Sequence, residues 1–170
     1  MQSVDTFSIT KFDQAYAVNV GGLRPDGENA LFLFDTGACV SLVGLNSLVD
    51  QNFHRRLGEL LQDEIQKNHV TPRQNMPKTV TQESLEVYPC KCDGVSIAAA
   101  APITFYFHIY LGIIDLPILG FDYIDDCSYH HEIGGKLIVS AIAKNVGKRF
   151  YPEKVIDFNK VKERFQSQII

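Results

Sequence analysis

The alternation of apolar and polar positions predicts a chain built mainly from strands. Residues 14–20 alternate loosely and are rich in strand formers, and residues 31–34 form a short run of four apolar side chains. Between them, residues 21–29 have the glycine, proline and asparagine content of a turn or loop. This pattern predicts a hairpin whose second strand is buried and ends at Asp35.

One long segment, residues 44–67, has the apolar spacing of an amphipathic helix or of a pair of helices. Its apolar residues recur at steps of three and four, which places them on one face of a helix. Gly58 lies inside the segment and is a candidate break between two shorter helices. The polar stretch that follows, residues 68–79, contains two prolines and is expected to be a loop.

The second half of the chain again predicts strands separated by short turns. Residues 103–110 alternate most clearly, and Asp93-Gly94 has the composition of a tight hairpin turn. The other predicted elements are strands over 79–81, 85–88, 113–119 and 136–142, a short helix over 122–127, a turn at 134–135 and a terminal helix over 158–170.

Composition narrows the class of protein. The 170 residues are 45% hydrophobic and 21% charged, which is enough apolar material for one domain with a real core. The net charge of −4 argues against nucleic acid as the main partner, and no apolar run predicts a membrane span or a signal peptide. The four cysteines are too few for a disulfide framework, so we expect a soluble protein in the reducing cytoplasm.

A short motif with chemical potential follows the first buried strand. Asp35 comes directly after four apolar residues and is followed by Thr36, Gly37 and Ala38. Taken alone, Asp-Thr-Gly is also good turn chemistry and can mark nothing more than the end of a strand. The interpretation changes because a second apolar run lies downstream, where Ile118-Leu119-Gly120 precedes an apparent helix start at Asp122.

Together the two motifs resemble those of the retropepsin-like aspartic proteases, the family of retroviral and retrotransposon proteases and their cellular relatives. The resemblance extends over residues 14–143 by element order. It implies a mainly β fold, with a single closed β-barrel-type acid protease domain over residues 1–143, a short helix after Ile-Leu-Gly and an inserted amphipathic helix. Residues 144–170 would form a C-terminal extension, partly helical and packed on the domain.

The resemblance also implies the roles of the motif residues. Two neighbouring carboxylates can share one proton, so that one activates water while the other protonates the departing amine. This chain has one Asp-Thr-Gly and no Asp-Ser-Gly, so Asp35 of a second copy would complete the pair in a homodimer. Thr36 would then hydrogen-bond across the dimer axis, Gly37 would let backbones approach closely, and Ala38 would line the cleft.

Further residues are expected around the substrate cleft. Ile118 and Leu119 would support the catalytic loop, although core packing alone also explains them, and Gly120 would let their strand pass tightly beneath that loop. The flap, a hairpin that closes over substrate in this family, is expected over residues 78–88. Its tip would be Gln82, Glu83 and Ser84, with Asp93-Gly94 as the competing tip.

Two positions depart from the retroviral pattern. Retroviral members often carry an acid two residues past the Asp-Thr-Gly glycine and an arginine directly after Ile-Leu-Gly, and these form an ion pair beside the active site. Here the positions hold Cys39 and Phe121. An apolar contact can replace the ion pair without leaving a buried charge alone, as in retrotransposon proteases, so Cys39 is counted among the cleft residues.

No metal and no cofactor is expected. Cys90-x-Cys92 lacks a standard zinc spacing, and Cys39 has no activating base near it in sequence. His130-His131-Glu132 precedes a Gly-Gly turn and predicts an exposed loop, and His108 is expected on the polar face of its strand.

The leading functional hypothesis is an aspartic endopeptidase that is active as a homodimer. Its cleft would bind an extended peptide as an added strand, and its role by resemblance is to process a retroelement polyprotein, in the cytoplasm or within a virus-like particle. Two alternatives stay open. One is a non-catalytic dimeric scaffold or peptide-binding module of the same fold, and the other is a cellular regulatory protease with a restricted substrate.

Overall fold

Strands dominate the fold. The computed structural model describes residues 5–12, 15–74, 85–141 and 147–169. Its strands are β1 (Asp5–Phe12), β2 (Ala15–Gly21), β3 (Ala30–Phe34), β4 (Leu42–Gly44), β5 (Arg73–Gln74), β6 (Glu86–Ile97), β7 (Ile103–Tyr110), β8 (Ile118–Leu119), β9 (Cys127–Glu132), β10 (Lys136–Ala141) and β11 (Ile156–Asp157). Its α-helices are α1 (His54–Asn68), α2 (Phe121–Ile124) and α3 (Phe158–Ile169), and 3-10 turns cover Leu45–Ser47, Gln51–Phe53 and Lys148–Phe150.

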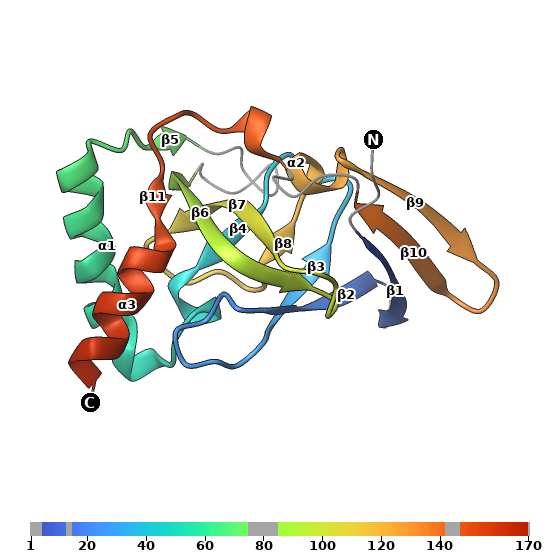
Figure 1. The fold of residues 1–170 in the computed structure, drawn as a ribbon, viewed down its shortest axis with the longest axis horizontal. Coiled ribbons are helices and arrows are strands. Elements are labelled where there is room, and N and C mark those ends of the chain that lie inside the picture. Colours follow the sequence, from blue (N-terminus) through green and yellow to red (C-terminus); the bar gives the residue numbers. More distant parts are fainter. Residues whose placement is uncertain (1–4, 13–14, 75–84, 142–146, 170) are drawn as a thin grey trace.

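Six of these strands close into a barrel. Their order is β6-β7-β4-β8-β3-β2, and β2 pairs back onto β6 where Val20 lies opposite Ile97. Strand β1 leaves the barrel, because its first part pairs with β10 and its last residues pair with β2. Strands β9 and β10 form a hairpin that projects from one end of the molecule (Figure 1). The mainly β, closed-barrel fold class predicted from the sequence is therefore confirmed.

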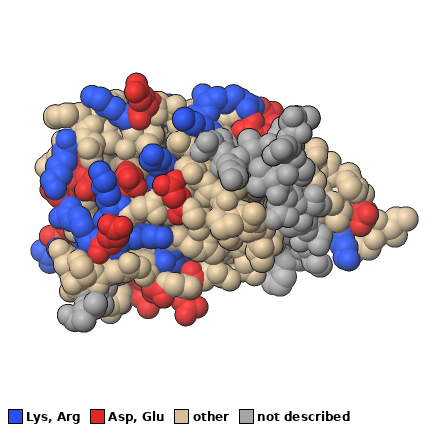
Figure 2. Space-filling model, viewed as in Figure 1, with Lys and Arg blue, Asp and Glu red and all other residues tan. Residues whose placement is uncertain are grey.

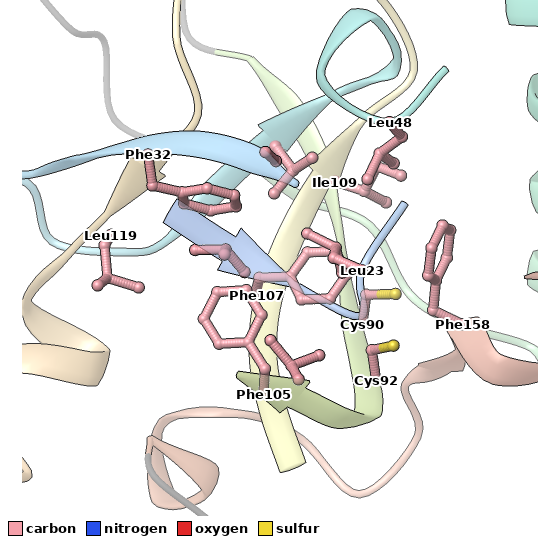
Figure 3. Close-up of a cluster of buried hydrophobic side chains, with 14 of the residues drawn as sticks. Leu23, Phe32, Leu48, Cys90, Cys92, Phe105, Phe107, Ile109, Leu119 and Phe158 are labelled. Carbon is pink, nitrogen blue, oxygen red and sulfur yellow. The ribbon is translucent and has the colours of Figure 1, made fainter. Parts of the chain in front are cut away.

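Aromatic side chains fill the barrel. Phe32, Phe105 and Phe107 are fully buried, and the rings of Phe105 and Phe107 stack with their centroids 5.1 Å apart. Cys90 and Cys92 of β6 belong to the same core and lie near Phe158 at the start of α3 (Figure 3). Burial raises the pKa of both thiols, to about 11 at Cys92, so these cysteines behave as small apolar residues.

Helices α1 and α3 pack against each other at the opposite end from the β9–β10 hairpin. The rings of Phe53 and Phe165 meet edge to face, and Arg164 pairs with Asp63 of α1. On the face shown in Figure 2, charged side chains gather at this helical end, and few lie toward the hairpin. None of the helices in the described ranges is long and apolar enough to cross a membrane.

The helix predicted over residues 44–67 begins later than expected. Residues 42–44 form β4, and α1 runs from His54 to Asn68. Leu45 and Leu48, which the pattern assigned to the helix, are buried from a 3-10 turn instead. The predicted break at Gly58 is also wrong, because α1 passes through this residue without interruption.

Three further predictions are wrong in the second half of the chain. Asp93-Gly94 lies inside β6 at a bulge, where the pairing with β7 shifts between Cys92 and Val95, and the hairpin turns at residues 98–102. The strand expected over 113–119 is limited to Ile118–Leu119. The segment around His130 is an exposed strand, β9, and not a loop.

Candidate active site

A loop of residues 35–41 carries the Asp-Thr-Gly motif from the end of β3 to β4. The backbone N–H of Asp35 donates to the carbonyl of Leu119 at 3.0 Å, and the N–H of Gly37 donates to Asp35 Oδ1 at 2.9 Å. The Asp35 side chain is half-buried, whereas Thr36 and Gly37 are exposed. The carboxylate is therefore held by the fold and is still accessible from solvent.

Strand β8 supports this loop from beneath. It pairs in parallel with β3, and Phe34 lies opposite Leu119. Directly after β8, the N–H of Phe121 donates to the carbonyl of Ala38 at 2.8 Å. A Cβ on Gly120 would overlap the backbone carbonyl of Val40 and lie 3.1 Å from the oxygen of Ala38. Because the φ angle of Gly120 is −101°, lack of space and not backbone conformation requires glycine here.

A buried polar network lies behind the loop, and apart from the predicted helix start at Asp122 no sequence pattern indicates it. Ser41 Oγ accepts the N–H of Gly120 at 3.0 Å and donates to Asp122 Oδ1 at 2.7 Å. Asp122 Oδ1 also accepts the N–H of Tyr123 at 2.9 Å, and the Tyr151 hydroxyl donates to Asp122 Oδ2. Ser41 and Asp122 are almost completely buried. Burial raises the pKa of Asp122, and the hydrogen bonds from Tyr151 and Ser41 oppose that rise.

His108 of β7 lies next to this network and is only 1% exposed, so the predicted position on a polar face is wrong. Its backbone N–H donates to the carbonyl of Ser41 at 2.8 Å, which ties β7 to the end of the loop. Arg73 donates to its Nε2 at 3.1 Å, and its ring stacks on Tyr151 with centroids 4.7 Å apart. Burial, and secondly the charge of Arg73, lowers the pKa of His108 to about 3.

The expected cleft residues are only partly brought together. Ile118 and Leu119 lie beneath the loop, and Cys39 is exposed within it. The proposed flap tip, Gln82, Glu83 and Ser84, lies outside the described residues. The competing tip at Asp93-Gly94 is excluded as a hairpin end, because β6 continues through it to Ile97.

The two positions that carry an ion pair in many retroviral proteases hold uncharged residues here, Cys39 and Phe121. Cys39 and Phe121 are both exposed, and Phe121 has 46% of its surface accessible. All four cysteines are free thiols. In the described ranges, no group of three or more His, Cys, Asp or Glu side chains is arranged to hold a metal ion.

Comparison with solved structures identifies the architecture. A retropepsin-like aspartic protease from Rickettsia conorii aligns over 82% of this chain and 92% of its own length, with a TM-score of 0.51 and 16% identity. This chain has a retropepsin-like fold. The EIAV protease complexed with the inhibitor HBY-793 aligns over 68% of this chain and 89% of its own, with a TM-score of 0.40 and 20% identity. No family model matches the sequence, and no curated protein does.

In the retropepsin-like barrel of this chain, replacement of Gly120 by alanine should loosen the loop above β8. The added methyl group would force apart β8 and the backbone of residues 38–40, and we expect the free energy of unfolding to fall by about 1–3 kcal/mol. Urea unfolding followed by circular dichroism measures this loss. The matched control is Gly58→Ala inside α1, where the new Cβ would lie 3.7 Å from the side chain of Leu45. This substitution should stabilise the protein by up to about 1 kcal/mol. Equal stability of Gly120→Ala and the unmodified chain would contradict the close packing.

Proposed function

We propose that this chain is an aspartic endopeptidase that is active as a homodimer, with one catalytic carboxylate, Asp35, from each copy. The observation that carries the proposal is the position of Asp35. It directly follows β3, in a loop that β8 supports on a retropepsin-like barrel. Its side chain accepts a hydrogen bond from the N–H of Gly37.

The proposed peptide hydrolysis uses the Asp35 carboxyl groups of two copies of the chain. Two carboxyl groups a few Å apart cannot both ionise at low cost, so the pair retains one proton near neutral and moderately acidic pH. The ionised member then takes a proton from water as it attacks the peptide carbonyl. The protonated member supplies the proton that the departing amine needs.

The surface around the loop supports a second copy of this chain as the partner. Phe121 and Tyr129 expose 46% and 43% of their surfaces, and the Tyr129 ring packs edge to face on Phe34, directly before Asp35. Among the described strands, β9 pairs only with β10, and its other edge has no partner strand among them. We infer that the exposed loop, these two aromatic side chains and the second edge of β9 form the dimer contact.

The proposed substrate is an extended peptide with apolar residues around the cut bond. It would bind as an added strand, using main-chain hydrogen bonds and alternating side-chain pockets. By resemblance, the natural substrate is a retroelement polyprotein and the place of action is the cytoplasm or a virus-like particle. The four free thiols are consistent with a reducing compartment.

The test is cleavage of a peptide library by the purified chain between about pH 4 and pH 7, with and without pepstatin. We expect cleavage that pepstatin blocks. Cleavage that pepstatin leaves untouched would contradict an aspartic mechanism. If the chain dimerises and cleaves no peptide, the non-catalytic scaffold is the better description.

Specific activity should also fall on dilution, because the catalytic pair forms only in the dimer. Below the dissociation constant of the dimer, the active fraction becomes proportional to protein concentration, so a tenfold dilution lowers specific activity about tenfold. A dilution series at fixed substrate, paired with sedimentation of the same samples, measures both quantities. Constant specific activity through the range in which the dimer dissociates would contradict a shared site.

A further inference from the structure

The C-terminal segment, residues 147–157, is attached to the two residues that directly follow the short helix α2. The N–H of Gly147 donates to Asp126 Oδ2 at 2.7 Å, and Arg149 pairs with both Asp125 and Asp126. Gly147 has a φ of +84°, and a Cβ there would lie 2.8 Å from the carbonyl oxygen of Asp122. This part of the chain passes close to α2 before it reaches β11 (Figure 1).

Tyr151 connects the C-terminal segment to β7 and to Asp122 of α2. Its ring is stacked on His108 and lies 5.5 Å from the ring of Tyr106, while its hydroxyl donates to Asp122. Burial raises the pKa of Tyr151 far above its ordinary value, so the phenol keeps its proton and acts as a donor. From the other side, Arg73 donates to the carbonyl of Phe150 at 3.1 Å and fixes the approach of the segment.

The contacts continue without a gap from Tyr151 to the loop that carries Asp35. Asp122 accepts from Tyr151 and Ser41, and Ser41 accepts from Gly120. Gly120 is flanked by the two residues whose backbones bond the loop. Leu119 accepts the N–H of Asp35, and Phe121 donates to Ala38.

The carboxylate of Asp122 depends on this arrangement. It is 1% exposed, and within the described chain it has no ion-pair partner, so hydrogen bonds alone stabilise its charge. Tyr151 supplies the donor to Oδ2, whereas Ser41 and the backbone of Tyr123 supply those to Oδ1. Loss of the Tyr151 hydroxyl removes a donor to Oδ2 of a buried carboxylate, and a shift of Asp122 would move Ser41 and Gly120 with it.

We propose that Tyr151 is a positioning residue for catalysis, which holds the Asp35 loop in its productive geometry from behind, through Asp122 and Ser41. The inference rests on the proposed function, because it takes Asp35 as the catalytic group. It assigns to the C-terminal segment a role in turnover as well as in folding. Displacements of about 1 Å at a catalytic group cost orders of magnitude in rate, so a brace at this distance from the chemistry affects kcat.

The test compares Tyr151→Phe with Tyr106→Phe in the full chain. Both changes remove one hydroxyl from neighbouring tyrosine rings, and only the first removes a donor to Asp122. In Tyr151→Phe we expect kcat for peptide cleavage to fall about tenfold with KM nearly unchanged, while Tyr106→Phe keeps both values. Ser41→Ala should lose a similar factor, and the double variant Ser41→Ala/Tyr151→Phe should lose little more than either single variant, because both act through Asp122.

A second measurement does not depend on activity. Amide hydrogen exchange should be about tenfold faster in Tyr151→Phe at Gly37, Ala38 and Gly120, with no change at Phe105 and Phe107 in the barrel core. If exchange accelerates equally throughout the barrel, or if Tyr106→Phe gives the same losses, Tyr151 is a structural anchor only and the inference is wrong. If the unmodified chain cleaves no peptide, the proposed function fails, while the exchange comparison still decides whether Tyr151 holds the loop.

Discussion

The Asp35→Asn variant is expected to lose peptide cleavage by a factor of about 10³ or more, with little change in stability. In the proposed homodimer this single substitution replaces both members of the catalytic pair. An amide neither takes a proton from water nor supplies one to the leaving amine at these pH values. The asparagine oxygen can still accept the N–H of Gly37, so the loop should keep its conformation.

A mixing experiment makes this prediction sharper than a loss of activity alone. When the Asp35→Asn chain is added in excess, wild-type copies are drawn into dimers that contain one carboxylate, so wild-type activity should fall as the variant is titrated in. Asp115→Asn is the matched control, because it removes the same charge from an exposed residue in the segment before β8. Full activity of Asp35→Asn, or wild-type activity that survives a large excess of the variant, would exclude Asp35 as half of a shared site.

The second large effect is loss of stability in acid, caused by His108. Its pKa is lowered to about 3, whereas the ordinary value of 6.5 applies in the unfolded chain. Between these values the unfolded state binds more protons than the folded state, so stability falls as the pH falls through this range. The shift corresponds to a loss of up to about 5 kcal/mol over the whole range, and of about 2 kcal/mol at pH 5.

This prediction is tested by measuring the free energy of unfolding in urea at several pH values for the wild type and for His108→Gln. Glutamine does not titrate, and its oxygen can accept the hydrogen bond of Arg73 in place of Nε2. The wild type should lose about 2 kcal/mol more than the variant between pH 7 and pH 5. Comparison of two chains that share all other titrating groups isolates the contribution of His108, and His130→Gln on exposed β9 controls for removal of an imidazole. Parallel pH profiles for the wild type and His108→Gln would contradict the prediction.

The position of His108 also bears on how an acid limb of the activity profile is interpreted. A carboxylate pair works best when it carries one proton, which favours moderately acidic conditions. In this chain, acid also opposes folding, because His108 binds a proton more readily in the unfolded state than in the folded state. Circular dichroism at each assay pH therefore separates titration of the proposed catalytic pair from loss of the folded structure.

The parts of the fold that the sequence predicted well are those set by local pattern. The hairpin of β2 and β3 delivers Asp35 as expected, because a buried strand needs apolar side chains and a turn needs glycine and proline. The terminal helix is likewise confirmed as α3. By contrast, Leu45 and Leu48 had helical spacing, but their burial arises in a 3-10 turn against the barrel. Spacing alone does not separate these two cases.

The features that were not predicted from the sequence depend on contacts between residues far apart in the chain. His108 was assigned to a polar face because its strand alternates, but β7 is covered on both sides, with the C-terminal segment over one of them. Asp93-Gly94 serves a bulge as readily as a hairpin turn, since both need the positive φ that Gly94 adopts. The contacts of Ser41, Asp122 and Tyr151 join three separate elements, and no local pattern indicates them.

The hydrogen bond between Tyr151 and Asp122 has a consequence for the order in which the site is completed during synthesis. Every strand of the barrel, together with Asp35 and Asp122, leaves the ribosome before Tyr151 does. A nascent chain can therefore close its barrel while Oδ2 of Asp122 still lacks its donor. If Tyr151 holds the Asp35 loop as proposed, the last support of that loop arrives only when the C-terminal segment has emerged and docked beside α2, after the barrel is already built.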